Sequence, residues 1–241
     1  EVNAINFTKV KLSANGVPVL SDLFIKADEI ATNDILVFIN SDIILPPNFF
    51  EVLKKIKNIP KRFLMVGHRW DCDIDEIIDF GKLKPDDEFW INIFKHSKKH
   101  APSGIDYFIY RRQTFKDLPN FIVGRPGYDN WIIWNARRRK IPVIDLTYEI
   151  KVFHQNHHFK FHNIKKDPKV FVEEDGANNL KIIGNNHLNL LDSNFLLKKN
   201  KIIKNTCEVF KNRNLGKLAV IYPEYAYILN LYKRFIRRIK K

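Results

Sequence analysis

The sequence predicts an α/β fold, with a mostly parallel sheet flanked by helices and a basic helical extension at the C-terminus. Two observations favour this class. Residues 35–39 form a short, branched apolar run typical of a strand buried on both faces. Apolar residues at helical spacing precede it over 20–31 and follow it over 49–56, and a second strand-like run occupies 63–67. Helix and strand thus alternate, as they do around parallel sheets.

The first helix is predicted from apolar residues at helical spacing, with Ser21 or Asp22 available near its start. Pro46-Pro47 suits the first turn of the second helix, because proline lacks the N–H that this turn leaves unused. Residues 71–103 are mixed and polar, and we expect a loop or an excursion from the sheet there.

The next part of the chain repeats this pattern. Residues 105–110 are strand-like, 128–139 have helical periodicity, and 141–145 and 149–153 resemble short strands. From residue 164 onward the chain is rich in Lys, Asn and Ile, has helical tendency and shows no internal repeat. We therefore predict one domain over 1–163 and a helical extension over 164–241.

The basic charge is concentrated in this extension. The net charge is +14, and residues 164–241 hold 17 Lys/Arg against 7 Asp/Glu, a surplus of 10. A basic chain invites a nucleic-acid function. The surplus lies outside the segment with the most motif-like residues, however, so we expect no nucleic-acid partner. No apolar run reaches the roughly 18 residues that span a bilayer, and two distant cysteines favour a reducing compartment.

Asn40-Ser41-Asp42 follows the buried strand directly. Ligands of open α/β sheets bind beyond the carboxyl ends of the strands. A carboxylate there can hold a divalent cation that bridges two phosphates, since Mg²⁺ takes one or two protein carboxylates and phosphate oxygens. The alternative is that Ser41 or Asp42 only caps the loop or the next helix.

Asp129 lies where a helix is predicted to begin, within Gly127-Tyr128-Asp129-Asn130-Trp131. Such an acid can be a helix cap stabilised by the helix dipole. It can also act as a base that removes the proton of an acceptor hydroxyl. We expect the dipole to keep this carboxylate ionised.

Histidines cluster at His154, His157, His158 and His162. Their spacing matches no standard zinc signature, so a zinc hydrolase is a minor alternative. A single histidine, His154, that completes a metal site begun by Asp42 is the simpler hypothesis, with the others as solvated loop residues.

Two further segments carry candidate binding residues. Arg69 could pair with phosphate and Trp70 could stack on a sugar. Asp106 lies in Gly104-Ile105-Asp106-Tyr107. Ordinary loop packing, with glycines that permit close approach, explains both segments equally well.

In this order, the segments resemble the GT-A fold of nucleotide-diphospho-sugar transferases, most clearly its family-2-like branch. The resemblance covers about residues 1–160. "ILVFINSD" (35–42) resembles the strand with the D-x-D metal motif, "FIVGRPGYDNWIIWNA" (121–136) the stretch with the x-E-D motif, and "IPVIDLTYEIKVFH" (141–154) the closing strands with the metal-binding histidine. "GIDYFIYRRQTF" (104–115) resembles the strand that shapes the acceptor pocket.

The resemblance implies a metal-dependent glycosyltransferase that inverts the anomeric carbon. Asp42 and His154 would bind Mn²⁺ or Mg²⁺, and Asp129 would be the catalytic base. Asn40 stands where the family often has an aspartate, and an amide is a weaker ligand. The remaining candidates for donor or acceptor binding are Ser41, Arg69, Trp70, Asp106, Asn130 and Trp131.

The implied partners are a nucleotide-sugar donor and a glycan or lipid-linked acceptor. In the family a nucleotide-binding strand–helix–strand unit precedes the helix predicted at 20–31, so we expect the catalytic domain to be N-terminally incomplete here. Apolar and basic residues alternate at helical spacing from Tyr225 to Lys241. Such a helix can lie on an anionic membrane or pack on the domain, and we expect a cytoplasmic protein that can reach a membrane surface. Alternatives are a non-catalytic sugar-binding or assembly module and the metal-dependent hydrolase.

Overall fold

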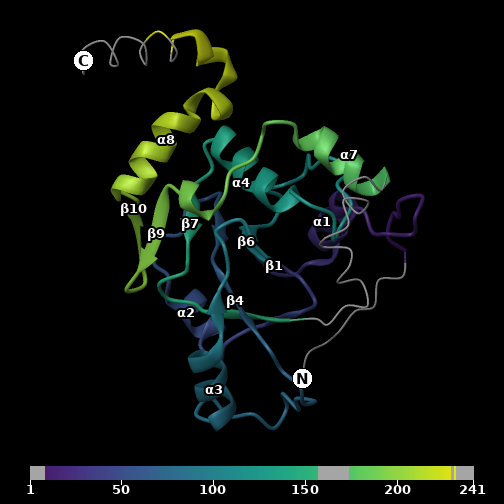
Figure 1. Cartoon of the computed structure of the whole chain (residues 1–241), viewed down its shortest axis with the longest axis vertical. Helices are drawn as coiled ribbons and strands as arrows, with labels where there is room; N and C mark the ends of the chain where they lie inside the picture. The colour runs from purple at the N-terminus through teal and green to yellow at the C-terminus, as the bar shows by residue number, and fades with distance from the viewer. Residues whose placement is uncertain (1–8, 157–173, 229–230, 232–241) are drawn as a thin grey trace. The chain divides into compact units, whose positions relative to one another are not determined.

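The computed structural model describes residues 9–156, 174–228 and 231 (Figure 1). The chain forms two compact units, each built from separate stretches of sequence. The first unit comprises Glu1–Leu36, Arg111–Tyr128 and His158–Gly184. The second unit comprises Val37–Tyr110, Asp129–His157 and Asn185–Lys241. This division does not follow the boundary at residue 163 that we expected, because stretches from both sides of that boundary enter each unit.

In the first unit, helices α1 (Leu20–Ile30) and α7 (Glu174–Ile183) pack with the segment 111–128. The backbone N–H of Leu20 donates to the carbonyl of Phe121 at 2.8 Å. The fully buried Asn179 side chain accepts from the N–H of Ile122 and donates to its carbonyl. The helix predicted over 20–31 is therefore present, and its buried residues Leu20 and Phe24 are among the apolar residues that predicted it.

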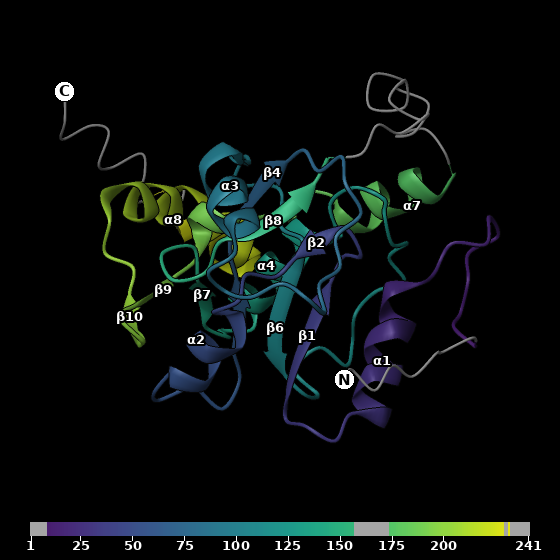
Figure 2. The same cartoon turned by 90° about the horizontal axis from the view of Figure 1, so that it is seen from below.

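The second unit holds most of two sheets. The six-stranded sheet has the order β1 (Ile35–Ile39), β6 (Tyr107–Arg111), β3 (Leu64–Val66), β7 (Val143–Asp145), β9 (Phe195–Lys198), β10 (Lys201–Lys204). The four-stranded sheet has the order β2 (Ile43–Ile44), β8 (Val152–Gln155), β4 (Arg69–Cys72), β5 (Lys98–Lys99). Figure 2 shows β2, β8 and β4 side by side.

The class is α/β, as predicted, but both sheets are mixed. Strand β7 runs parallel to β3 and β9, whereas β6 is antiparallel to β3 and β10 is antiparallel to β9. A two-residue connection such as that between β9 and β10 can only join antiparallel strands. The mostly parallel sheet that we expected is thus not confirmed.

Helices α2 (Phe49–Lys55), α3 (Glu88–His96), α4 (Tyr128–Arg138) and α8 (Glu208–Ile221) accompany these sheets. A hydrophobic core of the unit joins fully buried side chains of the strands, of α2 and of adjoining loops, among them Phe49, Phe63, Tyr107, Ile144 and Leu197. The helices predicted at 49–56 and 128–139 are therefore present, as are the strands predicted at 35–39, 63–67 and 105–110.

Two expectations were wrong in detail. Residues 71–103, expected as a loop or excursion, contain the second half of β4, all of α3 and all of β5, because Trp90 and Ile93 of α3 bury against Cys72 and Phe153. The segment 164–241, expected to be helical, contains the β9–β10 hairpin, and β9 pairs with β7 in the main sheet.

The C-terminal part carries the remaining elements. After the short helix η1 (Leu190–Asp192) and α8, the turn η2 (Pro223–Tyr225) begins the stretch expected to form a basic amphipathic helix. Most of that stretch lies outside the described residues. Within the described part of the chain, no helix is long and apolar enough to cross a membrane.

Candidate functional site

The link between the two sheets carries Asn40, Ser41 and Asp42. Asn40 directly follows β1 and is hydrogen-bonded to Asp106. Its backbone N–H donates to the carbonyl of Asp106 at 3.0 Å, and its side-chain amide donates to Asp106 Oδ1 at 2.8 Å. The carbonyl of Asp42 accepts from the N–H of Gln155 at 3.1 Å, which ties the link to β8. The Ser41 side chain is exposed.

Strand β8 places His154 between two carboxylates. In the four-stranded sheet His154 is opposite Ile43 of β2 on one side and Asp71 of β4 on the other. Its Nε2 lies 3.3 Å from Asp42 Oδ2, and its Nδ1 lies 3.4 Å from Asp71 Oδ1. The ring is buried. Residues far apart in the sequence therefore hold the two ring nitrogens in fixed environments.

Asp71 is itself held by two side chains. His100 Nδ1 lies 2.6 Å from Asp71 Oδ2, and Arg69 Nε lies 3.0 Å from Asp71 Oδ1. The absence of a side chain at Gly104 makes room for His100, since a Cβ there would approach the imidazole Cδ2 to 2.3 Å. This glycine thus serves a close approach, as its segment suggested.

Arg69 extends the cluster to Asp106. Its Nη1 lies 2.8 Å from Asp106 Oδ2, and Asp106 is buried. A buried carboxylate without a cationic partner would be costly, and Arg69 with the Asn40 amide supplies the compensation. We refer to the connected set as the carboxylate network: Asn40, Asp42, Arg69, Asp71, His100, Asp106 and His154.

Asp129 adjoins this network from the first turn of α4. The pKa of its carboxyl is raised from 3.8 to about 7: burial is the largest cause, the nearby charge of Asp106 also raises the pKa, and hydrogen bonds from backbone N–H groups oppose both. We expected the helix dipole to keep Asp129 ionised. Desolvation outweighs the hydrogen bonds that the carboxyl accepts from backbone N–H groups, so a pKa of about 7 puts its titration near neutral pH.

Three other predicted binding residues, Trp70, Asn130 and Trp131, have contacts with residues outside the carboxylate network. Side chains alternate along a strand, so Arg69 and Asp71 share one face of β4 while Trp70 is on the other. There Trp70 packs with Cys72, and Lys151 Nζ lies 5.2 Å from its ring centroid. Trp131 is buried beside Trp134, with 5.5 Å between the ring centroids. The Asn130 carbonyl accepts from Leu188 N–H.

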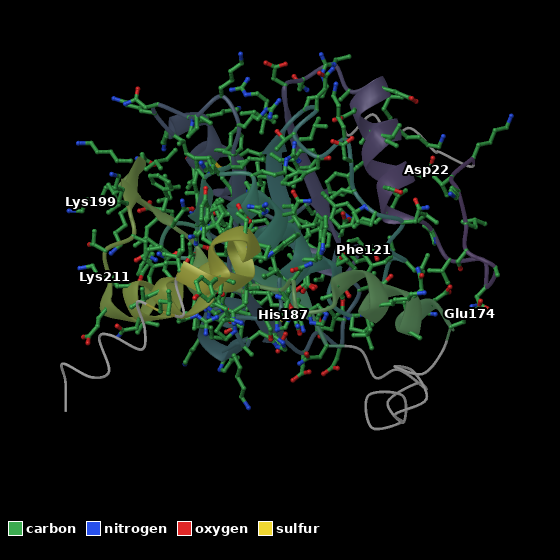
Figure 3. The ribbon with its side chains drawn as sticks, turned by 90° about the horizontal axis from the view of Figure 1, so that it is seen from above. Asp22, Phe121, Glu174, His187, Lys199 and Lys211 are labelled. Carbon is green, nitrogen blue, oxygen red and sulfur yellow. The ribbon has the colours of Figure 1, made fainter. Side chains whose placement is uncertain are left out.

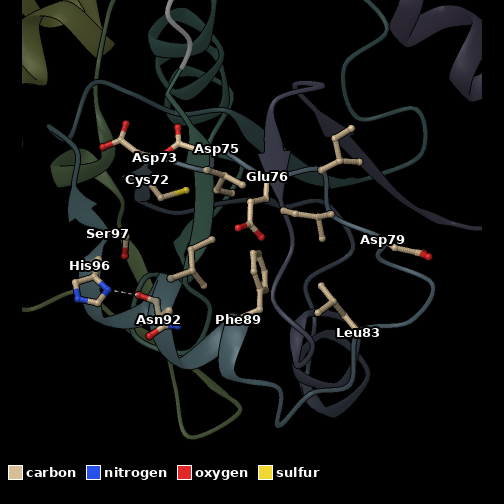
Figure 4. A pocket seen from close by; sticks show the side chains of 14 residues that line it. Cys72, Asp73, Asp75, Glu76, Asp79, Leu83, Phe89, Asn92, His96 and Ser97 are labelled. Atoms are coloured by element: carbon tan, nitrogen blue, oxygen red, sulfur yellow. Dashed lines mark hydrogen bonds between the residues drawn. The ribbon is translucent and has the colours of Figure 1, made fainter.

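Two clefts open beside the network. One, of about 570 Å³, is lined by Ser41 and Asp42, by residues 43–45 and 76–78, and by Phe80 and Gln155. The other, of about 630 Å³, is lined by residues 72–79 and by side chains of α3. Both contain residues 76–78. Figure 4 shows the second cleft, with the Glu76 carboxylate directed toward the ring of Phe89.

The pair Asp42 and His154 fits a divalent cation. Two ligand atoms that are each about 2.1 Å from one octahedral ion lie roughly 3 Å apart, close to the 3.3 Å between Asp42 Oδ2 and His154 Nε2. A carboxylate on the far nitrogen of a metal-binding histidine, where Asp71 lies, is usual. Among the described residues no group of three or more His, Cys, Asp or Glu side chains is arranged to hold a metal.

The sequence did not single out Asp71 and His100. Residues i and i+2 of a strand lie on the same face, so the candidate Arg69 could have pointed to Asp71 as a neighbour. His100 carries no local signal, because the pairing of β4 with β5 brings it to Asp71. His157, His158 and His162 lie outside the described residues.

The chain was also compared with known proteins. No family model matches it, and neither the curated proteins nor the solved structures include a match.

Proposed function

We propose that the protein is a metal-dependent glycosyltransferase, which moves a sugar from a nucleotide-diphosphate donor to an acceptor hydroxyl with inversion at the anomeric carbon. One observation carries the proposal: Asp42 and His154, which the sequence separates by more than a hundred residues, come within 3.3 Å of each other. Asp129 adjoins the same network through the charge of Asp106.

In this proposal Asp42 and His154 hold Mn²⁺ or Mg²⁺. A cation held there would supply positive charge to offset the negative charge that develops on the departing nucleoside diphosphate. Asp71 keeps the imidazole of His154 oriented, and Arg69 and His100 keep Asp71 in place. Those three side chains are positioning residues, since they act on the reacting groups through His154.

Asp129 is the proposed base. Its carboxylate takes the acceptor hydroxyl proton while the acceptor oxygen bonds to C1 of the donor sugar and the bond from C1 to the diphosphate oxygen breaks. A base works best when its pKa is near the working pH. The pKa of about 7 that burial gives Asp129 suits this task better than the ordinary value of an aspartate.

Acceptor binding is assigned to the cleft lined by Asp42 and to the larger cleft that shares residues 76–78 with it. Carboxylates such as Asp73, Asp75 and Glu76 line the larger cleft together with apolar side chains. Carboxylates accept hydrogen bonds from hydroxyl groups, so a glycan, free or lipid-linked, is the acceptor class that we propose. The proposal keeps the cytoplasmic location and the peripheral membrane contact that the sequence suggested.

A metal-dependent binding experiment tests the proposal. The full chain is titrated with a panel of nucleoside diphosphates, with Mn²⁺ and in buffer stripped of divalent cations, by calorimetry. We expect binding that requires Mn²⁺ and is lost in Asp42→Ala, while the matched variant Asp73→Ala still binds. Mn²⁺-independent binding, or equal binding by both variants, would refute the site.

A second function is supported by the pairing of Arg69 and Asn40 with Asp106, because paired side chains are less available to a donor. A non-catalytic sugar-binding or assembly module would show this property. It would bind oligosaccharides without binding any nucleoside diphosphate in the same titration. A zinc hydrolase, in contrast, would retain zinc through dialysis and would ignore nucleotides.

A further inference from the structure

A second charged feature lies at the other edge of the six-stranded sheet. A cleft of about 340 Å³ is lined by Lys54, Lys55, Ile56, Lys57, Lys199, Asn200 and Lys201. We call it the lysine cleft. The carboxylate network adjoins β1 through Asn40, whereas the lysine cleft adjoins β10, the strand at the opposite end of the sheet order.

The walls of the lysine cleft are held by backbone pairing. The Lys57 N–H donates to the Asn200 carbonyl at 3.4 Å, and Lys57 forms a parallel bridge with Lys201. Ile56 is buried in the same hydrophobic core as Phe49 and Leu197, and Ile202 of β10 also packs against that core. The end of α2 and the tip of the hairpin therefore lie side by side and are joined by backbone pairing (Figure 2).

The hairpin turn presents its lysines in a defined geometry. Lys198 pairs with Lys201, so the turn consists of Lys199 and Asn200 alone. Both have positive φ, 49° and 59°, which is the conformation of a type I′ turn. Such turns favour Asn and Gly, and a lysine in this region carries a conformational cost. Lys199 lies at the outer edge of the hairpin (Figure 3).

Local effects account for only part of this charge. Lys54 and Lys55 lie in the last turn of α2, where the helix dipole favours cations. Two carboxylates reach the cleft within the described residues: Glu51 lies 3.4 Å from Lys55 Nζ, and Glu149 accepts from the backbone N–H of Lys199 at 2.5 Å. Five lysines against two glutamates leave a local surplus of three positive charges, to which Lys57, Lys199 and Lys201 contribute without the helix.

The chemistry of the lining indicates the ligand class. Lysine ammonium groups act as point charges toward phosphate, without the planar fork that arginine offers to one carboxylate. The lining contains no aromatic side chain on which a nucleic-acid base could stack. The volume suits a small ligand. We propose that the lysine cleft binds a ligand that carries two or more phosphate groups, either a soluble polyphosphate or the headgroup of a phosphorylated lipid.

The test compares two triple variants of the full chain with equal charge. One carries Lys57→Gln, Lys199→Gln and Lys201→Gln. The control carries Lys95→Gln, Lys116→Gln and Lys211→Gln, which are exposed and lie outside the cleft. Each protein is titrated by calorimetry with inorganic tripolyphosphate in buffer stripped of divalent cations, so that any cation site at Asp42 does not contribute. Circular dichroism confirms that each variant is folded.

We expect tripolyphosphate to bind the natural chain, more weakly as salt is raised, and the cleft variant to lose about tenfold or more in affinity. The control variant should stay within about twofold, since dispersed surface charges are screened. Equal losses in both variants would show a general charge effect and would overturn the proposal. A natural chain that binds no tripolyphosphate would overturn it as well.

The source of the phosphate is decided by sedimentation with phosphatidylcholine vesicles, with and without a phosphoinositide bisphosphate. Binding to the charged vesicles that is lost in the cleft variant and kept in the control supports the lipid headgroup. Tripolyphosphate binding without vesicle binding supports a soluble ligand. Vesicle binding that is equal in both variants would show that the lysine cleft is not the lipid contact.

Discussion

The two edges of the six-stranded sheet differ in how their charged side chains are arranged. In the carboxylate network, near β1, ions of both signs contact one another: Arg69 joins Asp71 to Asp106, and His154 lies between Asp42 and Asp71. In the lysine cleft, near β10, five exposed lysines gather on one surface with two glutamates. Paired, partly buried charges hold side chains in position. A surplus of like charge on the surface attracts a ligand of the opposite sign.

The largest predicted effect concerns Asp129, which adjoins the carboxylate network. Once donor and acceptor are known, Asp129→Asn should lower the transfer rate about 10²- to 10⁴-fold, because an amide cannot accept the acceptor proton. Binding of nucleoside diphosphate with Mn²⁺ should be unchanged. Steady-state kinetics checks the rate and calorimetry the binding. Transfer at the natural rate would remove Asp129 from its role as the base.

The next effect separates positioning from general charge. Asp71→Asn should weaken Mn²⁺ binding about 10- to 100-fold, as expected for the partner of a metal-binding histidine. Asp73→Asn, two residues along and exposed, changes the charge equally and should have little effect. Mn²⁺ titrations of the full chain with nucleoside diphosphate present provide the comparison. Similar losses of Mn²⁺ affinity in both variants would show that Asp71 acts only through its negative charge and not by positioning His154.

A third effect follows from the raised pKa of Asp129. The unfolded chain loses this proton near pH 4 and the folded chain only near pH 7. Between these values the folded state binds more protons, so this carboxyl makes the free energy of unfolding fall as pH rises. Asp129→Asn removes that term, and its stability relative to the natural chain should rise by a few kcal/mol from pH 4 to pH 7 and then stay level.

Urea unfolding at a series of pH values measures this difference. Asp75→Asn is the control, because Asp75 is exposed. A stability difference for Asp129→Asn that does not change with pH would show that Asp129 is ionised in the folded protein, as the helix dipole alone suggested.

The smallest predicted effect concerns the space around His100. A methyl group at Gly104 would lie 2.3 Å from the imidazole Cδ2 and would displace the ring from Asp71. We expect Gly104→Ala to destabilise the fold by about 1–3 kcal/mol, as overpacking does. Gly216→Ala is the matched control: nothing lies within 4 Å of an added Cβ in α8, and alanine favours the helix. Urea unfolding should therefore show a lower free energy of unfolding for Gly104→Ala and a higher one for Gly216→Ala.

The sequence predicted the elements whose apolar pattern is strong. The run 35–39 and the helices at 20–31, 49–56 and 128–139 are present because their apolar residues recur at the period of the element they form. The direction of the strands was less predictable. The residues of β6 do not predict that it runs antiparallel to β3, because strand direction depends on the path of the intervening chain.

The candidate site shows the same division. Asn40, Asp42, Asp106, Arg69 and His154 were singled out from short motifs, and the structure joins them in one network. Trp70 was singled out beside Arg69, yet strand alternation turns it to the other face. His100 and the lysine cleft depend on strand pairing between distant segments, which no local pattern reveals.

The proposed metal site is tested most directly by asking whether His154 binds the metal ion. Electron paramagnetic resonance of Mn²⁺ bound to the full chain with nucleoside diphosphate, using protein labelled with ¹⁵N-histidine, detects nitrogen bound to the ion. We predict a ¹⁵N coupling that disappears in His154→Gln and remains in His96→Gln, which changes an exposed histidine of α3 that is not part of the carboxylate network. Bound Mn²⁺ without that coupling, or a coupling that survives His154→Gln, would contradict the proposed metal site.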